Sequence, residues 1–532
     1  MKKHLQQTLC VLLSIVLLFG CASAAFAAQE SDTPVIVVSG MGSRGMTVHD
    51  TGKSAFPPAT DNIVKGVFLA LGPILSAILF GNGALFDKYG ADAVYGMLAD
   101  LACDEDGVSI KQLDSVLYPE SAAHYRAEFE AETTNEHGFV RSVAEAHGWD
   151  NTYFFNYDWR RSPLDIADDL AEMVAAVKAE HGAEKVSLFA MSMGGDVLSA
   201  YLSKYGSDDI QTAVYASTAF LGVEMVSELL SGNLFLNTDA LLTYFVPFLQ
   251  SADLQVLAKV FDLADKAAEK DGMDTVNAIM ARTVKAVQDP MYQKIFRDTF
   301  TRFLGVWSFV PADQYEACKA YSKTYTTMSD AFWKKADAMI AVQKDTKNLI
   351  EKARRNGTNV YIIGAYGFAG IPVSKAYVNH TDTLIDTHLM SGNCAVAPYG
   401  KTLADIGYTP NGGCGNKSHY HFSTDGVIDA SVGFLPEHTW LIRGMSHVEF
   451  AYGHATSDLG VWLVTSEKPV DIHTDARYPQ FTALDRSTGK LVSLTQNVTV
   501  PDDGRTPAAK NFFQKILSFF RTVMLRVLNI FG

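Results

Sequence analysis

The chain is poor in basic residues for its length. Its 532 residues include 44 lysines and arginines against 59 aspartates and glutamates, giving a formal net charge of -15 at pH 7. Because nucleic acids bind to basic surfaces, this balance argues against DNA or RNA as a general partner. The 48% of hydrophobic residues is nevertheless enough to bury a large core.

Cysteine is scarce as well, and no cysteine spacing matches a standard zinc site. Beyond the N-terminal segment the chain has Cys103, Cys318, Cys394 and Cys414. In an exported protein Cys394 and Cys414 would be the favoured local disulfide pair. Together with His419 and His421 they could instead gather a metal, but the spacing does not favour it. We therefore expect no metal and no other cofactor.

The N-terminus has the pattern of a bacterial secretory signal. Lys2 and Lys3 precede an apolar run over residues 9–19, and small residues follow up to a cleavage option at Ala25-Phe26-Ala27. Residues 1–27 are thus predicted to be a signal peptide. A lipoprotein signal ending at Cys21 is the alternative. Either one predicts export, to the extracellular space or to the outer face of the cytoplasmic membrane.

One internal run, residues 66–85, carries no charge and reaches the length of a membrane span. Gly72, Pro73, Gly81 and Gly83 interrupt it, which favours a buried or interfacial helical hairpin. We assign it to an apolar helical insertion over residues 56–118.

The rest of the chain alternates between strand and helix patterns. Short apolar strands are predicted around residues 35–38, 186–189, 212–218, 359–367 and 438–444, and at the start of the stretch 151–163, which continues as a loop. A helix ending at Gly182 and another after the serine turn at residue 192 are predicted as well. Such alternation predicts an α/β fold with a mostly parallel central sheet flanked by helices.

Between the two halves of this pattern lie more than a hundred residues of helical character. They cannot form a plain loop in a compact domain, so residues 221–357 are predicted to be an inserted helical cap. The core would then comprise residues 34–220 and 358–470. A C-terminal extension (471–500), a linker (501–509) and an amphipathic helix (510–532) complete the predicted organisation.

The stretch "VSLFAMSMGGDVLSAYL" places one serine between an apolar strand and a helix. Ala190 and Gly194 are small residues two positions before and after Ser192, as a nucleophile elbow requires where strand and helix backbones crowd together. The other reading is an ordinary turn with Ser192 as a helix N-cap. A catalytic serine needs a histidine to remove its proton and an acid to orient that histidine.

Both partners follow in the order typical of an α/β-hydrolase, serine, acid and then histidine. Asp425 lies in "STDGVIDAS" and His447 follows the predicted strand 438–444. Asp382, in "HTDTLIDTHLMSG", is the alternative acid. The oxyanion would be held by the backbone N–H of Met193 and by that of Met41, in the glycine-rich turn after the first strand.

The segments "PVIVVSGMGS", "NYDWRRSP", "LFAMSMGG", "TDGVIDAS" and "GMSHVEF" together resemble the lecithin:cholesterol acyltransferase and lysosomal phospholipase family of α/β-hydrolases. The resemblance spans residues 34–450, with the cap only loosely similar. It implies ester chemistry on lipids through an acyl-enzyme on Ser192, with Asp425 and His447 completing the triad. It also implies a membrane-contacting insertion at residues 56–104. The sequence departs from the family pattern at Ser39-Gly40, Met191 and Thr424. The resemblance therefore does not identify the substrate.

The predicted function is therefore that of a serine hydrolase of lipid esters, a lipase, phospholipase or acyltransferase. The alternatives are a non-lipid esterase or peptidase, and a catalytically silent binding protein on the same fold.

The C-terminal segment "KNFFQKILSFFRTVMLRVLNIFG" has an apolar face with Lys515, Arg521 and Arg526 opposite it. This pattern predicts a helix lying on an anionic membrane surface, and docking on the protein's own core is the alternative.

Overall fold

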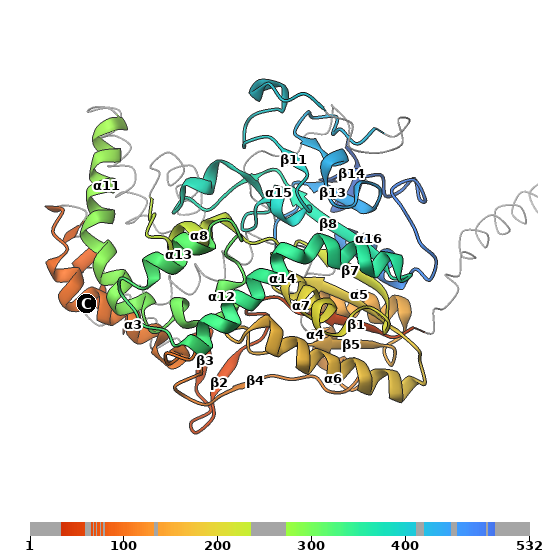
Figure 1. Cartoon of the computed structure of the whole chain (residues 1–532), viewed down its shortest axis with the longest axis horizontal. Coiled ribbons are helices and arrows are strands. Elements are labelled where there is room, and N and C mark those ends of the chain that lie inside the picture. The colour runs from red at the N-terminus through yellow and green to blue at the C-terminus, as the bar shows by residue number, and fades with distance from the viewer. Residues whose placement is uncertain are drawn as a thin grey trace, which may run out of the picture.

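The structure is a computed structural model (Figure 1). It describes residues 33–58, 65–66, 69–70, 72–74, 76–77, 80–131, 137–235, 273–410, 420–447, 449, 455–485 and 488–494. The predicted signal peptide, the linker and the C-terminal helix lie outside the described residues.

An eight-stranded sheet forms the centre, in the order β15-β14-β13-β8-β7-β6-β1-β5. The strands are β1 (Val35–Val38), β5 (Thr152–Phe155), β6 (Val186–Met191), β7 (Ile210–Ala216), β8 (Asn359–Tyr366), β13 (Thr439–Arg443), β14 (Phe481–Asp485) and β15 (Lys490–Ser493). All neighbours run parallel except β14 and β15, which are antiparallel. This confirms the predicted mostly parallel sheet of an α/β-hydrolase.

Helices cover both faces of the sheet, since successive strand residues point to opposite sides. Ile36 and Val38 of β1 pack with α6 (Pro163–His181), α7 (Gly194–Tyr205) and α14 (Asp330–Arg355). Val35 and Val37 pack with α4 (Arg126–Ala131), α5 (His137–His147) and α16 (Ala455–Thr465) on the other face. The strands are thus buried on both sides, which is why they read as continuous apolar runs.

Helix α6 shows how local signals set an element's ends. The Ser162 hydroxyl accepts the N–H of Leu164, and Pro163 occupies the first turn, where a missing N–H costs nothing. Gly182 ends the helix in the left-handed conformation, with φ of 61°.

The predicted insertion begins and ends at a small antiparallel sheet of β2 (Met46–Val48), β3 (Ser54–Phe56) and β4 (Leu113–Ser115). Its described helical part comprises η1 (Phe86–Gly90), α3 (Ala91–Leu98) and η2 (Ala99–Leu101). Figure 1 shows these segments in orange beside α11 (Met273–Pro290). Within the described residues, no helix combines the length and apolar character that crossing a bilayer requires.

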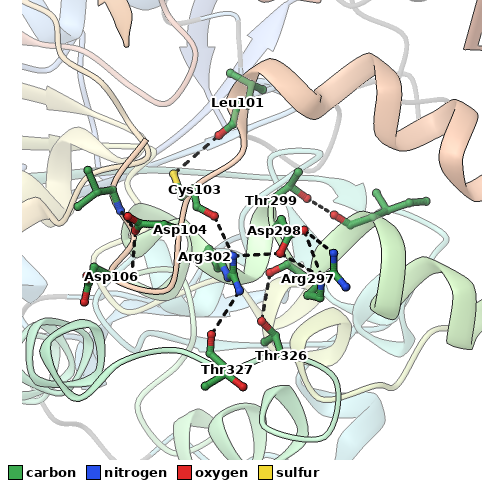
Figure 2. A network of polar contacts seen from close by, with 12 residues as sticks. Leu101, Cys103, Asp104, Asp106, Arg297, Asp298, Thr299, Arg302, Thr326 and Thr327 are labelled. Carbon is green, nitrogen blue, oxygen red and sulfur yellow. Dashed lines mark hydrogen bonds and ion pairs between the residues drawn. The ribbon is translucent and has the colours of Figure 1, made fainter. Parts of the chain in front are cut away.

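The insertion is fastened to the cap by polar contacts that Figure 2 shows. The Cys103 N–H donates to the Asp298 carbonyl at 2.9 Å, and the Arg302 guanidinium donates to the Cys103 carbonyl at 3.2 Å. Asp298 also pairs with Arg302 at 3.0 Å. Segments almost two hundred residues apart in sequence therefore form one unit.

The cap differs from its predicted bounds in one respect. Its described elements are α8 (Glu224–Leu230), α11, η3 (Met291–Phe296), η4 (Phe300–Arg302), α12 (Leu304–Trp307) and α13 (Tyr315–Ser322). Helix α14, which we assigned to the cap, instead packs against α7 and β8 and covers the sheet. The sequence of α14 has the same helical periodicity as the rest of the region. This periodicity predicts a helix but does not show which element the helix packs against.

The second half of the core also extends beyond residue 470, because β14 pairs with β13 and β15 with β14. The residues predicted to be a C-terminal extension thus contain the last two strands of the sheet. Short elements fill the remainder: β9 (Phe368–Ala369), η5 (Lys375–Val378), β10 (His380–Thr381), α15 (Thr387–Met390), β11 (Ala395–Val396), η6 (Ala404–Ile406), β12 (Ile428–Asp429), η7 (Ala430–Val432) and η8 (Pro436–His438).

Candidate active site

Ser192 sits in the sharp turn between β6 and α7. Its φ is +51°, in the left-handed region that a residue with a side chain rarely adopts. The turn is held by its backbone, since the Ser192 carbonyl accepts the N–H groups of Gly195 at 3.1 Å and Ala219 at 3.2 Å. Such a strained elbow projects the serine hydroxyl beyond the carboxyl edge of the sheet.

The two glycines after the serine are required by close backbone approach. A Cβ on Gly194 would lie 2.7 Å from the Val38 carbonyl oxygen and 2.9 Å from that of Ser39. A Cβ on Gly195 would lie 2.4 Å from the Thr218 Cβ. The helix that follows the nucleophile can therefore press against the ends of β1 and β7 only without these side chains.

His447 lies within hydrogen-bond distance of Ser192, with its Nε2 3.0 Å from the serine Oγ. Its Nδ1 lies 2.7 Å from Asp382 Oδ2, and its backbone N–H donates to the Asp382 carbonyl at 2.6 Å. With Nδ1–H donating to the carboxylate, Nε2 is left to accept the serine proton. Ser192 directly follows β6, Asp382 directly follows β10 in the segment between β8 and β13, and His447 follows β13.

Asp382 is fully buried, and its two carboxylate oxygens have different hydrogen-bond partners. Oδ1 accepts the N–H groups of Leu384 at 3.0 Å and Ile385 at 2.8 Å, while Oδ2 faces His447. The loop thereby fixes the carboxylate in the orientation that the imidazole needs.

Our prediction that Asp425 is the acid disagrees with this geometry, which places the alternative, Asp382, against His447. The Asp425 carboxylate accepts the Tyr366 hydroxyl at 2.9 Å and that of Ser423 at 2.6 Å, and it pairs with Arg443 at 3.6 Å. Asp425 lies near the ends of β8 and β13, but its oxygens contact the Tyr366 and Ser423 hydroxyls and the Arg443 guanidinium. Sequence order could not separate the two aspartates, because both follow Ser192 and precede His447.

Met41 follows β1 and Met193 directly follows the nucleophile, which are the chain positions expected of the two oxyanion donors. Among the described residues, neither backbone N–H has a hydrogen-bond partner, so both remain available as donors. The close approach of Gly194 to the end of β1 brings the turn that leads to Met41 against the elbow.

The "YDWR" segment supports this turn, a role that sequence reasoning had not assigned. The Tyr157 hydroxyl donates to the Ser39 carbonyl at 2.6 Å. The buried Arg160 pairs with Asp158 at 2.6 Å and donates to the Leu101 carbonyl at 2.8 Å. The segment thus joins the turn after β1 to the base of the insertion.

The remaining polar candidates form no ligand cluster in the part of the chain that the structure describes. Cys103, Cys318 and Cys394 are free and buried, and burial raises the pKa of each thiol to about 12. The expected partners Cys414 and His419 lie outside the described residues. His421 is described, and its Nδ1 contacts the Gln480 amide oxygen at 2.8 Å.

Comparison with known proteins adds a family model described as Serine aminopeptidase, S33, which matches residues 159–296. None of the curated proteins matches the chain. A solved structure described as the crystal structure of the Tle4-Tli4 complex is 12% identical, over 63% of this chain and 75% of that one. Its TM-score is only 0.25, too low to support a structural argument.

The matched segment includes the elbow serine and its helix. The family model supports the broad hydrolase class and does not extend to the narrower resemblance to lipid acyltransferases. With its mostly parallel sheet and strained elbow the chain has the α/β-hydrolase fold, and the family model supports a hydrolase of the serine type.

Proposed function

We propose that the protein hydrolyses or transfers acyl groups of lipid esters through an acyl-enzyme on Ser192. The contact chain from Ser192 through His447 to Asp382 supports this proposal more than any other observation. It supplies a nucleophile, a base within reach of its proton, and a buried acid that orients the base.

In the first step His447 Nε2 takes the hydroxyl proton as Ser192 Oγ forms a bond to the ester carbonyl carbon. The oxyanion that develops would accept the N–H groups of Met41 and Met193. When the ester C–O bond breaks, the imidazolium returns its proton to the departing alcohol. Water, or a second alcohol, then attacks the acyl-enzyme with the same base, releasing the acyl product.

Exposed apolar side chains favour a lipid ester as substrate. The insertion exposes several large ones, among them Phe80 at 74% and Tyr89 at 52%. Exposed apolar groups of this kind favour contact with a lipid surface, and export would bring the enzyme to one outside the cell.

Ser192→Ala tests the proposal directly. The wild type should react with a fluorophosphonate and hydrolyse p-nitrophenyl esters, with a preference for longer acyl chains. The variant should lose labelling and several orders of magnitude of turnover while keeping its far-UV circular dichroism. Near-normal turnover by Ser192→Ala would remove Ser192 as the nucleophile.

A peptidase activity is the second candidate, because the matching family model is described as a serine aminopeptidase. The same triad would then attack an amide. Aminoacyl-naphthylamides measured beside the ester series separate the two, since an aminopeptidase would cleave them and show no preference for long acyl chains.

A further inference from the structure

The loop that carries Asp382 is a closed turn with a second aspartate at its base. An isolated bridge pairs Thr381 with Asp386, and the Asp382 N–H donates to the Ile385 carbonyl at 3.3 Å. Asp382 is therefore held at one end of a short, hydrogen-bonded loop while Asp386 closes the other end. A displacement of Asp386 would be transmitted to Asp382 through the three residues between them and through these hydrogen bonds.

Asp386 does not use its carboxylate for its own helix. It stands at the N-cap of α15, but no N–H of that helix reaches its side chain. Its Oδ2 instead accepts the backbone N–H of Glu224 at 2.8 Å, and its Oδ1 accepts the Asn379 amide at 2.8 Å. Glu224 is the first residue of α8, whose own N-cap, Val223, has no side-chain oxygen to offer. Asp386 thus supplies the missing cap from a distant part of the chain.

Other contacts bind α8 to the same segment. Glu224 pairs with His388 Nε2 at 3.2 Å and accepts the Asn379 amide at 3.0 Å. In return, Glu228 of α8 accepts the N–H groups of Lys375 and Ala376, at the start of η5. Helix α8 is thus capped by Asp386 of the acid loop, and α8 in turn caps η5, which directly precedes that loop.

We infer that α8 holds the triad acid in place through Asp386, which makes Asp386 a positioning residue and couples the cap to the catalytic triad. The inference rests on the proposed function, because it assumes that the Asp382–His447 contact serves catalysis. A shift of α8, as when the cap opens or a ligand binds beneath it, would release the Asp386 contact and let Asp382 move from His447.

The protonation state of Asp386 fits this role at neutral pH. Its side chain is only 2% exposed, and burial raises its pKa to about 6, against the bonds from Asn379 and Glu224, which lower it. The charged groups around it are Glu224 and His388, with Asp313 acting on His388. Above that pKa both carboxylate oxygens accept, so both bonds to the neighbouring segments are complete.

The bond to α8 can be removed without changing Asp386. Glu224→Pro deletes the N–H that Asp386 accepts, while Glu224→Ala deletes only the side chain. Proline is favoured at the first helical position, and Val223 is already extended (φ -140°, ψ 116°), as the residue before a proline should be. Both variants should fold, and comparing them isolates the contact between the backbone nitrogen of residue 224 and Asp386, where the proline ring carbon replaces the donated hydrogen.

We expect the kcat of Glu224→Pro on a soluble p-nitrophenyl ester to be about 10-fold below that of Glu224→Ala, with KM nearly unchanged, because misplacement of the triad affects the chemical step. Labelling by the fluorophosphonate should slow in parallel. The downfield imidazole N–H resonance of His447, observed by proton NMR, should shift or broaden in Glu224→Pro alone. Asp405→Asn, which removes an exposed carboxylate that caps a remote loop at Thr402, should behave as wild type.

A double-mutant cycle completes the test. In an Asp386→Ala background, Glu224→Pro and Glu224→Ala should have the same kcat, because the bond that distinguishes them is already lost. Equal kcat values in the wild-type background, or a difference that persists without Asp386, would overturn the inference. Failure of the wild type itself to react with the phosphonate would instead refute the proposed function.

Discussion

Asp382 and Asp425 present the same functional group in surroundings that give it different tasks. Asp382 is buried against the imidazole of His447, at 2.7 Å. Asp425 instead accepts the Tyr366 hydroxyl at 2.9 Å and forms an ion pair with Arg443 at 3.6 Å. A carboxylate orients a catalytic histidine only when one of its oxygens is directed at Nδ1, so contact and not residue type assigns the role.

The corresponding substitutions should differ widely in effect. Asp382→Asn keeps the shape of the side chain but can present an N–H₂ to Nδ1, which favours the wrong tautomer and should lower kcat by roughly 10⁴-fold. Asp425→Asn should lower it less than about 10-fold. Steady-state kinetics on one soluble ester measure both, and a larger loss in Asp425→Asn would return the acid to that loop.

At the scale of elements, the site depends on how closely α7 approaches the sheet. The N-terminus of α7 contacts the ends of β1 and β7 through Gly194 and Gly195, with no room for a Cβ. This approach places Ser192 in its strained turn and brings the Met41 turn beside it. The nucleophile is thus positioned by backbone packing, which the small residues of the elbow permit.

Gly194→Ala should therefore destabilise the protein by about 2 kcal/mol and lower activity, because the added Cβ would meet backbone oxygens that cannot move independently. Gly96→Ala in α3 is the matched control, since a Cβ there meets nothing within 4 Å. Urea unfolding followed by tryptophan fluorescence gives both values. Equal stability of the two variants would show that α7 can shift without cost.

At the scale of the whole molecule, buried histidines couple stability to pH. His438, the last residue of η8, lies 3.2 Å from an Arg354 guanidinium nitrogen and stacks on Tyr361. Burial, with Arg354 adding to it, lowers the pKa of His438 to about 4, and burial lowers that of His380 likewise to about 4. The folded protein therefore favours the neutral imidazoles, whereas the unfolded chain binds protons near pH 6.5.

Their contribution to stability should be complete above about pH 6.5 and should be lost progressively as the pH falls toward 4. His438→Gln, which cannot take up the proton, should reduce this acid-induced loss by about 1–2 kcal/mol. Unfolding free energies of wild type and variant at pH 7 and pH 4.5 test this. The same pH dependence in both proteins would mean that His438 is not the sensor.

Membrane association is a second property of the whole molecule, and here it stays a prediction. A chain ending at residue 509 should remain folded and active on soluble esters but lose binding to anionic vesicles, because the basic, amphipathic segment 510–532 is absent. Vesicle co-sedimentation measures this loss. Full binding by the shortened chain would place the membrane contact elsewhere, for instance on the exposed apolar residues of the insertion.

The sequence by itself determined the features that depend on neighbours in the chain. The strand at Val35–Val38 and the end of α6 at Gly182 agree with the predicted positions, because apolar runs and caps are local signals. The elbow at Ser192 could be predicted equally well, since its small residues lie within two positions of the serine. The helical periodicity of α14 could be predicted too, but its packing against the sheet could not.

The choice of acid was decided by tertiary structure alone. The pattern Thr-Asp-x-x-Ile-Asp occurs twice, with Asp382 and Asp386 in the first copy and Asp425 and Asp429 in the second. In both copies the first aspartate accepts the N–H of the residue two positions later. Asp382 also accepts the N–H of Ile385, whereas the N–H of Ile428 goes to Ser423. The repeated pattern alone does not show which copy faces the histidine.

What separates them is the strand with which each copy pairs. The first copy begins in β10, which pairs with β9 close after β8, whereas the second ends in β12, which pairs with β11. Asp382 thereby meets the loop of His447, which accounts for the contact at 2.7 Å. Asp386 likewise reaches α8, whereas Asp429 accepts the N–H of Ser431 in its own short helix. The roles of Asp382 and Asp386 are set by partners 65 and 162 residues away, and such pairings exist only once the sheet has brought distant segments together.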